Sequence, residues 1–187
     1  MSGKKNIVFG FLYLVLTAAL GPYMVREMLP VAGEAAQKKQ QVVAKLQLLA
    51  DSGWEDPETL ESLDAEAIAK RAAEAVLAVN AQLNARAPLE AMKGGPHAHG
   101  NLEALLNVAA GLVLLFLAVP RWAKETISWI FIAGALLHSG MLYLATLGVG
   151  WAGAVLGTGI GPILVLAGLL AIGVAALVGL RPRPVEG

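Results

Sequence analysis

The chain has 187 residues, of which 57% are hydrophobic and only 15% are charged. Because about a quarter of the residues of a soluble domain are charged, this composition indicates a membrane protein. The 14 basic and 14 acidic residues balance, so nothing suggests a nucleic-acid partner. The chain contains no cysteine, which excludes disulfides, iron–sulfur clusters, thiolate metal sites and covalently attached c-type haem.

Four apolar stretches are long enough to cross a membrane, which takes about 20 helical residues. They span residues 7–25, 102–119, 127–149 and 154–180. The first is too long for the apolar part of a signal peptide, about 7–15 residues, and we expect an uncleaved helix. Gly21 and Pro22 predict a kink near its far end. The short connections RWAKE and GVGWAG make neighbouring crossings antiparallel.

A polar insert separates the first and second crossings and has the pattern of two amphipathic helices. Residues 31–50 and 65–87 each place apolar side chains near one face. Asp56 before Pro57, and Asp64 before an alanine-rich run, are typical of helix starts. We therefore predict a helical hairpin, which is either a solvated spacer or a docking surface.

These elements predict an all-α membrane protein. Its fold is a four-transmembrane-helix antiparallel bundle with an extracytoplasmic helical hairpin between the first and second crossings. The predicted domains are a first transmembrane helix at 1–29, the hairpin at 30–95 and the three-helix remainder of the bundle at 96–187.

The distribution of basic residues near the crossings predicts the orientation, because short cationic segments face the cytoplasm. The side that holds both termini has six basic residues and two acidic ones, which are Lys4, Lys5, Arg121, Lys124, Arg181, Arg183, Glu125 and Glu186. The other side has the remaining eight basic and twelve acidic residues. We expect a multi-pass protein of a bacterial-type inner membrane, with cytoplasmic termini and residues 30–100 extracytoplasmic.

Three glycines recur every four residues in the last apolar stretch, at Gly153, Gly157 and Gly161. This spacing is typical of close helix packing, either within the bundle or at a homo-oligomer seam. Besides the lipid bilayer, the expected partner is a membrane protein or a second copy of the chain. The contact would use these glycines or the hairpin at 31–87.

Two histidines open the second crossing, in the segment GGPHAHGN. If this segment is extended, His97 and His99 point the same way and can chelate one ion. If a helix begins at Pro96 instead, both lie in its first turn, where the helix dipole keeps imidazole neutral and able to bind a metal. A hydrogen-bonding role at the membrane interface is the alternative to metal or haem binding.

Glu103 and Asn107 follow His99 at spacings of four, on one helical face. Because ionisable groups are costly in a bilayer, we expect this face to point into the protein. Glu103 is then a metal ligand, a group that orients His99, or a proton carrier. His138 lies inside the third crossing and is either functional or a packing residue bonded to Asn107 or a backbone carbonyl.

The depth of each histidine limits how they can combine. Counted from the cytoplasmic ends of the crossings at about 1.5 Å per residue, His138 is roughly level with Asn107, and His99 is about 15 Å higher. His99 and His138 are therefore not expected to be the two axial ligands of one haem. We predict a metal site of His97, His99 and Glu103, with His138 and Asn107 beneath it as further cofactor-binding residues.

Three short motifs stand out in the second and third crossings. They are His97-Ala98-His99-Gly100-Asn101 at the start of a crossing, Pro120 at its end, and Leu137-His138-Ser139-Gly140 in the next crossing. Together they resemble small four-helix proteins related to subunit I of the haem–copper oxidases. The resemblance implies a histidine-rich membrane site suited to haem or copper, in a respiratory context. It does not imply oxidase activity, because subunit I has more crossings and more histidine ligands.

The sequence thus favours an integral inner-membrane protein with a histidine-based haem or copper site at the outer membrane face. No nucleophile–base pair, phosphate loop or catalytic carboxylate pair is visible, so we expect no catalytic activity from the chain alone. The alternative is a structural or assembly subunit of a larger membrane complex with no cofactor of its own. A transporter is a third hypothesis.

Overall fold

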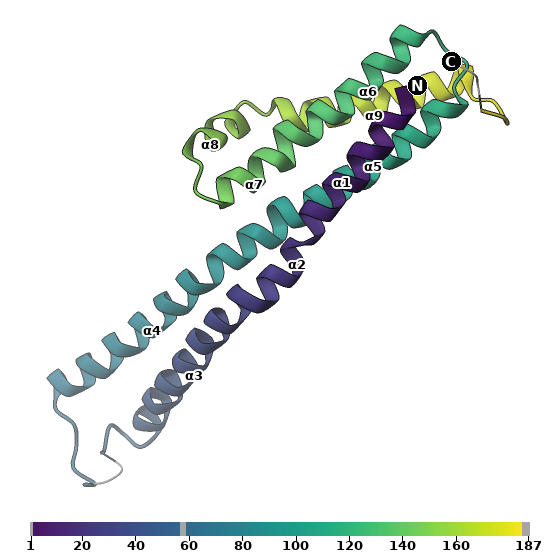
Figure 1. Cartoon of the computed structure of the whole chain (residues 1–187). Coiled ribbons are helices and arrows are strands. Elements are labelled where there is room, and N and C mark those ends of the chain that lie inside the picture. The colour runs from purple at the N-terminus through teal and green to yellow at the C-terminus, as the bar shows by residue number, and fades with distance from the viewer. Residues whose placement is uncertain (1, 57–58, 185–187) are drawn as a thin grey trace. The chain divides into compact units, whose positions relative to one another are not determined.

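The computed structural model describes residues 2–56 and 59–184, and its regular elements are helices (Figure 1). Within these ranges β-pairing is limited to two isolated bridges, Glu55 with Ser62 and Leu117 with Leu180. Four helical stretches are long and apolar enough to cross a membrane, and they are Gly3–Asp51, Ala65–Phe116, Arg121–Thr146 and Ile160–Gly179. The predicted helical class and the number of potential crossings are confirmed.

The chain divides into two compact units, which are described separately. Unit 1 comprises Met1–Pro22 and Ala91–Gly187, and unit 2 comprises Tyr23–Glu90. The main helices of unit 1 are α1 (Ser2–Ala18), α5 (Ala98–Phe116), α6 (Arg121–Ala135), α7 (Met141–Thr146), α8 (Gly150–Gly157) and α9 (Ile160–Gly179). Two π-helical turns, η2 (Lys93–His97) and η3 (Leu136–Gly140), precede α5 and α7.

Helices α1 and α5 lie side by side in Figure 1, and glycines bring their backbones close together. A Cβ atom added at Gly10 would lie 2.6 Å from the carbonyl oxygen of Ala104. An added Cβ atom at Gly3 would likewise contact the carbonyl oxygen of Gly111, and one at Gly100 would contact the side chain of Thr17. Because the contacts on α5 run from Gly111 back to Gly100 as α1 advances, the two helices run in opposite directions.

A buried apolar cluster holds α5, α6 and α9 together. Its core comprises Ala110, Leu114, Leu117, Ile127 and Phe131, and apolar residues of α9 from Ala171 to Ala176 pack against it. The glycine Gly168 on α9 lets the ring of Phe131 approach, since a Cβ atom there would lie 3.1 Å from the ring. This packing positions the third crossing against the second, which is where the site described below lies.

The first crossing is interrupted where the sequence predicts a kink. Helix α1 ends at Ala18, and the short helix α2 (Leu20–Tyr23) follows. Pro22 has no N–H group to bond the carbonyl of Ala18, which explains the interruption.

The last crossing differs from its prediction. The apolar stretch at 154–180 was expected to be one helix, but α8 ends at Gly157 and α9 begins at Ile160. Between them Gly159 has a φ of 68°, a left-handed conformation that ends an α-helix and that glycine adopts at little cost. Gly161 packs against Leu137 of η3, whereas Gly153 and Gly157 have no neighbour within 4 Å of an added Cβ among the described residues. The three glycines therefore do not form one face of one helix.

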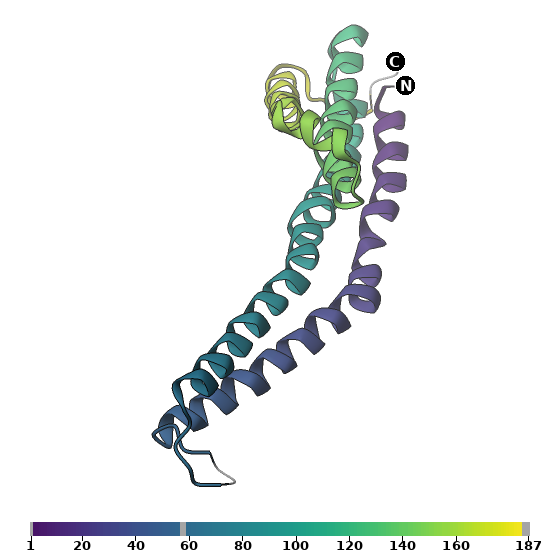
Figure 2. The same ribbon diagram turned by 90° about the vertical axis from the view of Figure 1, so that its left-hand side faces the viewer.

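Unit 2 contains α3 (Leu29–Asp51) and most of α4 (Ala65–Met92), preceded by the π-helical turn η1 (Met24–Met28). The two helices extend along one another to a connecting segment (Figure 2). The carboxylate of Asp64 accepts a hydrogen bond from the N–H of Ala67 at 2.7 Å, so the predicted helix start is confirmed. Pro57, the other predicted helix start, lies outside the described residues.

Candidate metal site

Glu103 lies at the centre of a polar cluster in unit 1. It is on the face of α5 that also carries His99 and Asn107, as the spacing of four predicts. The residue is 3% exposed, which would be costly for an unpaired carboxylate. Both carboxylate oxygens have partners on η3, the π-helical turn of the third crossing.

The turn η3 presents two consecutive residues to Glu103. Nδ1 of His138 lies 2.5 Å from Oε1 of Glu103. The backbone N–H of Ser139 donates to Oε2 at 3.3 Å, and the Ser139 hydroxyl donates to the same oxygen. Single π-helical turns inside α-helices occur often at functional sites. Helix α9 packs close behind this turn, since an added Cβ at Gly161 would lie 2.6 Å from the backbone nitrogen of His138.

Tyr13 extends this hydrogen-bonded chain to α1. Its hydroxyl lies 2.9 Å from the Ser139 Oγ atom. Either hydroxyl can be the donor in this bond, and the Ser139 hydroxyl also lies 3.1 Å from the carbonyl oxygen of Ala135. The Tyr13 ring stacks on Phe9, with ring centroids 5.2 Å apart, so its position is set by packing as well. Three helical segments of unit 1 thus contribute to the environment of one carboxylate.

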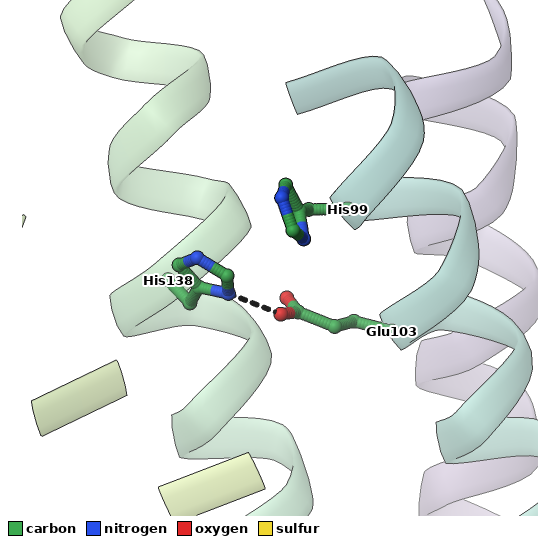
Figure 3. A group of neighbouring side chains, drawn as sticks. All are labelled: His99, Glu103 and His138. Carbon is green, nitrogen blue, oxygen red and sulfur yellow. Dashed lines mark hydrogen bonds and ion pairs between the residues drawn. The ribbon is translucent and has the colours of Figure 1, made fainter. Parts of the chain in front are cut away.

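His99 completes a group of three potential metal ligands (Figure 3). The ligand atoms of His99, Glu103 and His138 all lie within 4.8 Å of one another. The His99 and His138 ring centroids are also 4.8 Å apart, with the rings tilted by 57°. Metal–ligand bonds to nitrogen and oxygen are about 2.0–2.2 Å long, which places two ligands of a tetrahedral ion about 3.4 Å apart. Small side-chain rotations would therefore bring the three ligands onto one ion.

The proximity of His99 and His138 corrects the prediction made from depth. That estimate placed His99 about 15 Å above His138, because it counted from the start of the apolar stretch at residue 127. Helix α6 begins earlier, at Arg121, and α5 ends at Phe116. His138 is 17 residues after Arg121, and His99 is 17 residues before Phe116. The two histidines are therefore level.

Asn107 serves packing in this structure and does not bond His138. Its side-chain amide donates to the carbonyl oxygens of Glu103 at 3.0 Å and Phe131 at 3.3 Å. Its oxygen accepts a hydrogen bond from the amide of Asn6 at 3.0 Å. Asn6 also bonds both the hydroxyl and the carbonyl oxygen of Ser128. This buried amide group ties α1, α5 and α6 together, as interhelical hydrogen bonds do in membranes.

His97 lies apart from the three clustered ligands. His97 and Ala98 have helical dihedral angles, so the extended geometry in which His97 and His99 chelate one ion is not formed. The chain kinks at Gly95 instead, and the helix resumes at Pro96. Residues two apart on a helix diverge, and Nδ1 of His97 lies 3.0 Å from the carbonyl oxygen of Thr17 on α1. The hydroxyl of Thr17 in turn donates to Asn101 at 2.8 Å.

Sequence reasoning missed Tyr13 and Ser139. A signal for Tyr13 was present, because Asn6, Tyr13 and Thr17 recur at spacings of seven and four in an otherwise apolar stretch. All three are buried and bond other helices. Ser139 follows His138 directly, and both residues lie in the π-helical turn and contact Glu103.

Comparison of the chain with known protein families, curated proteins and solved structures finds no match. The function therefore has to be argued from the site.

Proposed function

We propose that the chain is a multi-pass integral membrane protein whose crossings form an antiparallel bundle, and that it binds a divalent transition-metal ion at His99, Glu103 and His138. One observation carries this proposal. Three side chains of metal-ligating type, from two different helices, converge to within 4.8 Å of one another, with Glu103 buried, His138 partly exposed and His99 exposed. A buried ionisable side chain on a membrane-length helix is rare and usually functional.

Two imidazoles and one carboxylate suit a divalent first-row ion, and copper(II) is our first choice because the affinity series of these ions peaks at copper. Haem fits less well. Iron with an imidazole on each side, bonded at about 2.0 Å, would hold the two ring centroids about 6 Å apart. Here they are 4.8 Å apart, and a carboxylate lies between the same helices. The charge of Glu103 would offset part of the charge of the ion.

The surroundings of Glu103 also support binding of an ion. Ser139 is hydrogen-bonded to Oε2 of the Glu103 carboxylate, and Tyr13 is hydrogen-bonded to Ser139. These bonds orient the carboxylate so that Oε1 points toward His138. Groups that orient ligands in this way typically contribute 10- to 100-fold to metal affinity. The ion would take the place of the proton that His138 shares with Oε1. Three protein ligands leave a further coordination position for an exchangeable ligand, as in catalytic or redox sites.

The experiment is metal analysis of the full chain, purified in mild detergent and loaded with copper(II) or zinc(II). We expect one ion per chain, lost in the double variant His99→Ala/His138→Ala. The matched control is His97→Ala, which removes an imidazole of the same segment outside the cluster and should keep the ion. A folded wild-type chain that takes up no ion would refute the proposal. Loss of the ion from the His97→Ala control would instead support the His97–His99 site predicted from the sequence.

A second candidate function is a structural or assembly subunit of a larger membrane complex, and unit 2 favours it. No residue of α3 is buried, and exposed apolar side chains such as Leu48, Val76 and Leu83 lie along the two helices. A hollow of about 630 Å³ lies at the far end of the hairpin, lined by residues of both helices that include Val42, Leu46, Leu49 and Arg71. Deleting residues 35–87 should then abolish co-purification of a partner, and His99→Ala/His138→Ala should not.

A further inference from the structure

One end of unit 1 gathers basic side chains from three separate parts of the chain. Lys4 lies in the first turn of α1, and Arg121 and Lys124 lie in the first turn of α6. Arg181 and Arg183 follow the end of α9. Apart from Lys124, all of these residues are exposed.

Backbone contacts hold these parts at the same end, where Figure 1 shows the start of α1 and the end of α9 close to the α5–α6 connection. The N–H of Ala118 donates to the carbonyl of Gly179 at 2.7 Å, and the N–H of Arg181 donates to that of Phe116 at 2.9 Å. Gly3 meets Gly111 near the end of α5. Arg181 therefore lies beside the connection that leads into Arg121.

Acidic residues do not balance this end. Within the described part of unit 1, the acidic residues are Glu103, in the metal cluster, and Glu125. Glu125 forms an ion pair with Lys5, whose ammonium also lies 4.4 Å from the centre of the Trp129 ring. Among the described residues, this end therefore keeps an excess of positive charge.

Lys124 is the most informative of these residues. It is 8% exposed, and within the described residues its ammonium group has no hydrogen-bond or ion-pair partner. No fully covered side-chain nitrogen lacks a partner there, so the ammonium must reach the surface while the apolar stem is covered. A lysine held in this way presents a positive charge at a fixed position, where an anion can bind it.

The neighbouring tryptophan indicates where that anion comes from. Trp122 is 72% exposed, between Arg121 and the covered stem of Lys124. Exposed tryptophans at the ends of membrane-crossing helices lie at the level of the lipid headgroups. A headgroup phosphate would then explain why Lys124 lies at the helix end with no partner among the described residues.

We propose that Lys124, Arg121 and Arg181 form a binding site for the phosphate of an anionic lipid headgroup. Basic side chains at the membrane surface attract anionic lipids, with roughly a fivefold gain in binding per residue. The site is separate from the metal cluster and does not depend on it. Lipid bound here would link the start of α6 to the end of α9, and we expect it to stabilise the folded chain.

The test is native mass spectrometry of the full chain in detergent, titrated with phosphatidylglycerol, phosphatidylcholine or inorganic phosphate. We expect phosphatidylglycerol to be retained in preference to phosphatidylcholine. The variant Lys124→Gln/Arg181→Gln should bind it at least tenfold more weakly, as two lost basic residues imply. The control Lys38→Gln/Lys70→Gln removes the same charge from unit 2 and should bind like the wild type.

Three results would overturn the proposal. They are equal retention of the two lipids, equal weakening by the control, and competition by inorganic phosphate at the same concentration as the lipid. If the double variant does not fold, Arg181→Gln alone serves the test. Arg181 is exposed beyond α9, and this single change should weaken phosphatidylglycerol binding about fivefold. Wild-type binding by Arg181→Gln would then count against the site.

Discussion

Nδ1 of His138 lies 2.5 Å from Oε1 of Glu103, although the two residues are 35 positions apart in the sequence. The bond joins the second crossing to the third. When Nδ1 donates to the carboxylate, the proton of the ring is on Nδ1. A metal ion bound at Nδ1 then requires that proton to move to Nε2.

Metal binding should depend on pH. A histidine ring nitrogen binds an ion only when that nitrogen carries no proton, so protons compete with the ion and the apparent metal affinity should fall as the pH is lowered. Chelator competition with copper(II) at pH 6, 7 and 8 measures this dependence. An affinity that does not change over the range would contradict binding of the ion through imidazole nitrogens.

The hydroxyls behind Glu103 should matter for affinity although they do not touch the ion. Ser139→Ala removes a hydrogen bond to Oε2, and we expect metal affinity to fall about 10- to 100-fold with the fold retained. Tyr13→Phe acts one step further away and should have a smaller effect in the same direction. Tyr143→Phe removes a hydroxyl outside the cluster and is the control. Equal affinity in Ser139→Ala and the wild type would contradict an orienting role.

The buried amide group should contribute to stability and not to metal binding. Asn107→Ala removes hydrogen bonds to Asn6 and to two backbone carbonyls, each worth about 0.6 kcal/mol on average in membrane proteins. We expect a loss of about 2 kcal/mol in unfolding free energy, measured by denaturant titration in detergent, with one ion still bound by the folded protein. The exposed Asn84→Ala in unit 2 should change little. Loss of the ion from folded Asn107→Ala would instead support the sequence prediction that Asn107 takes part in cofactor binding.

The close approach of α1 and α5 should be sensitive to side-chain size. Gly10→Val puts methyl groups where Ala104 and Val108 already lie, and we expect destabilisation of about 1–3 kcal/mol or more. Gly173→Val is the matched control, because an added Cβ at Gly173 has no neighbour within 4 Å among the described residues. Thermal unfolding in detergent compares the two variants. Similar melting temperatures would mean that the helices separate at little cost.

Part of the site could be predicted from the sequence, and the face of α5 shows why. The spacing of His99, Glu103 and Asn107 is a local property of one helix, so their common face followed from the spacing alone. The residues facing them did not. Predicting that His138 is level with His99 required the start of α6, which lies six residues before the apolar stretch, at Arg121. Hydropathy measures the membrane-buried part of a helix and not its full length.

The sequence by itself determined that this protein is helical, that four helices are long and apolar enough to cross a membrane, and that α4 begins after Asp64. Hydrophobic length and helix capping depend on residues close together in the chain, which is why they can be read from it. Only the tertiary structure decided that Glu103 meets His138 and Ser139 while His97 turns to Thr17. Those partners depend on the register between helices, which follows from close packing at glycines and from a π-helical turn that no local pattern reveals.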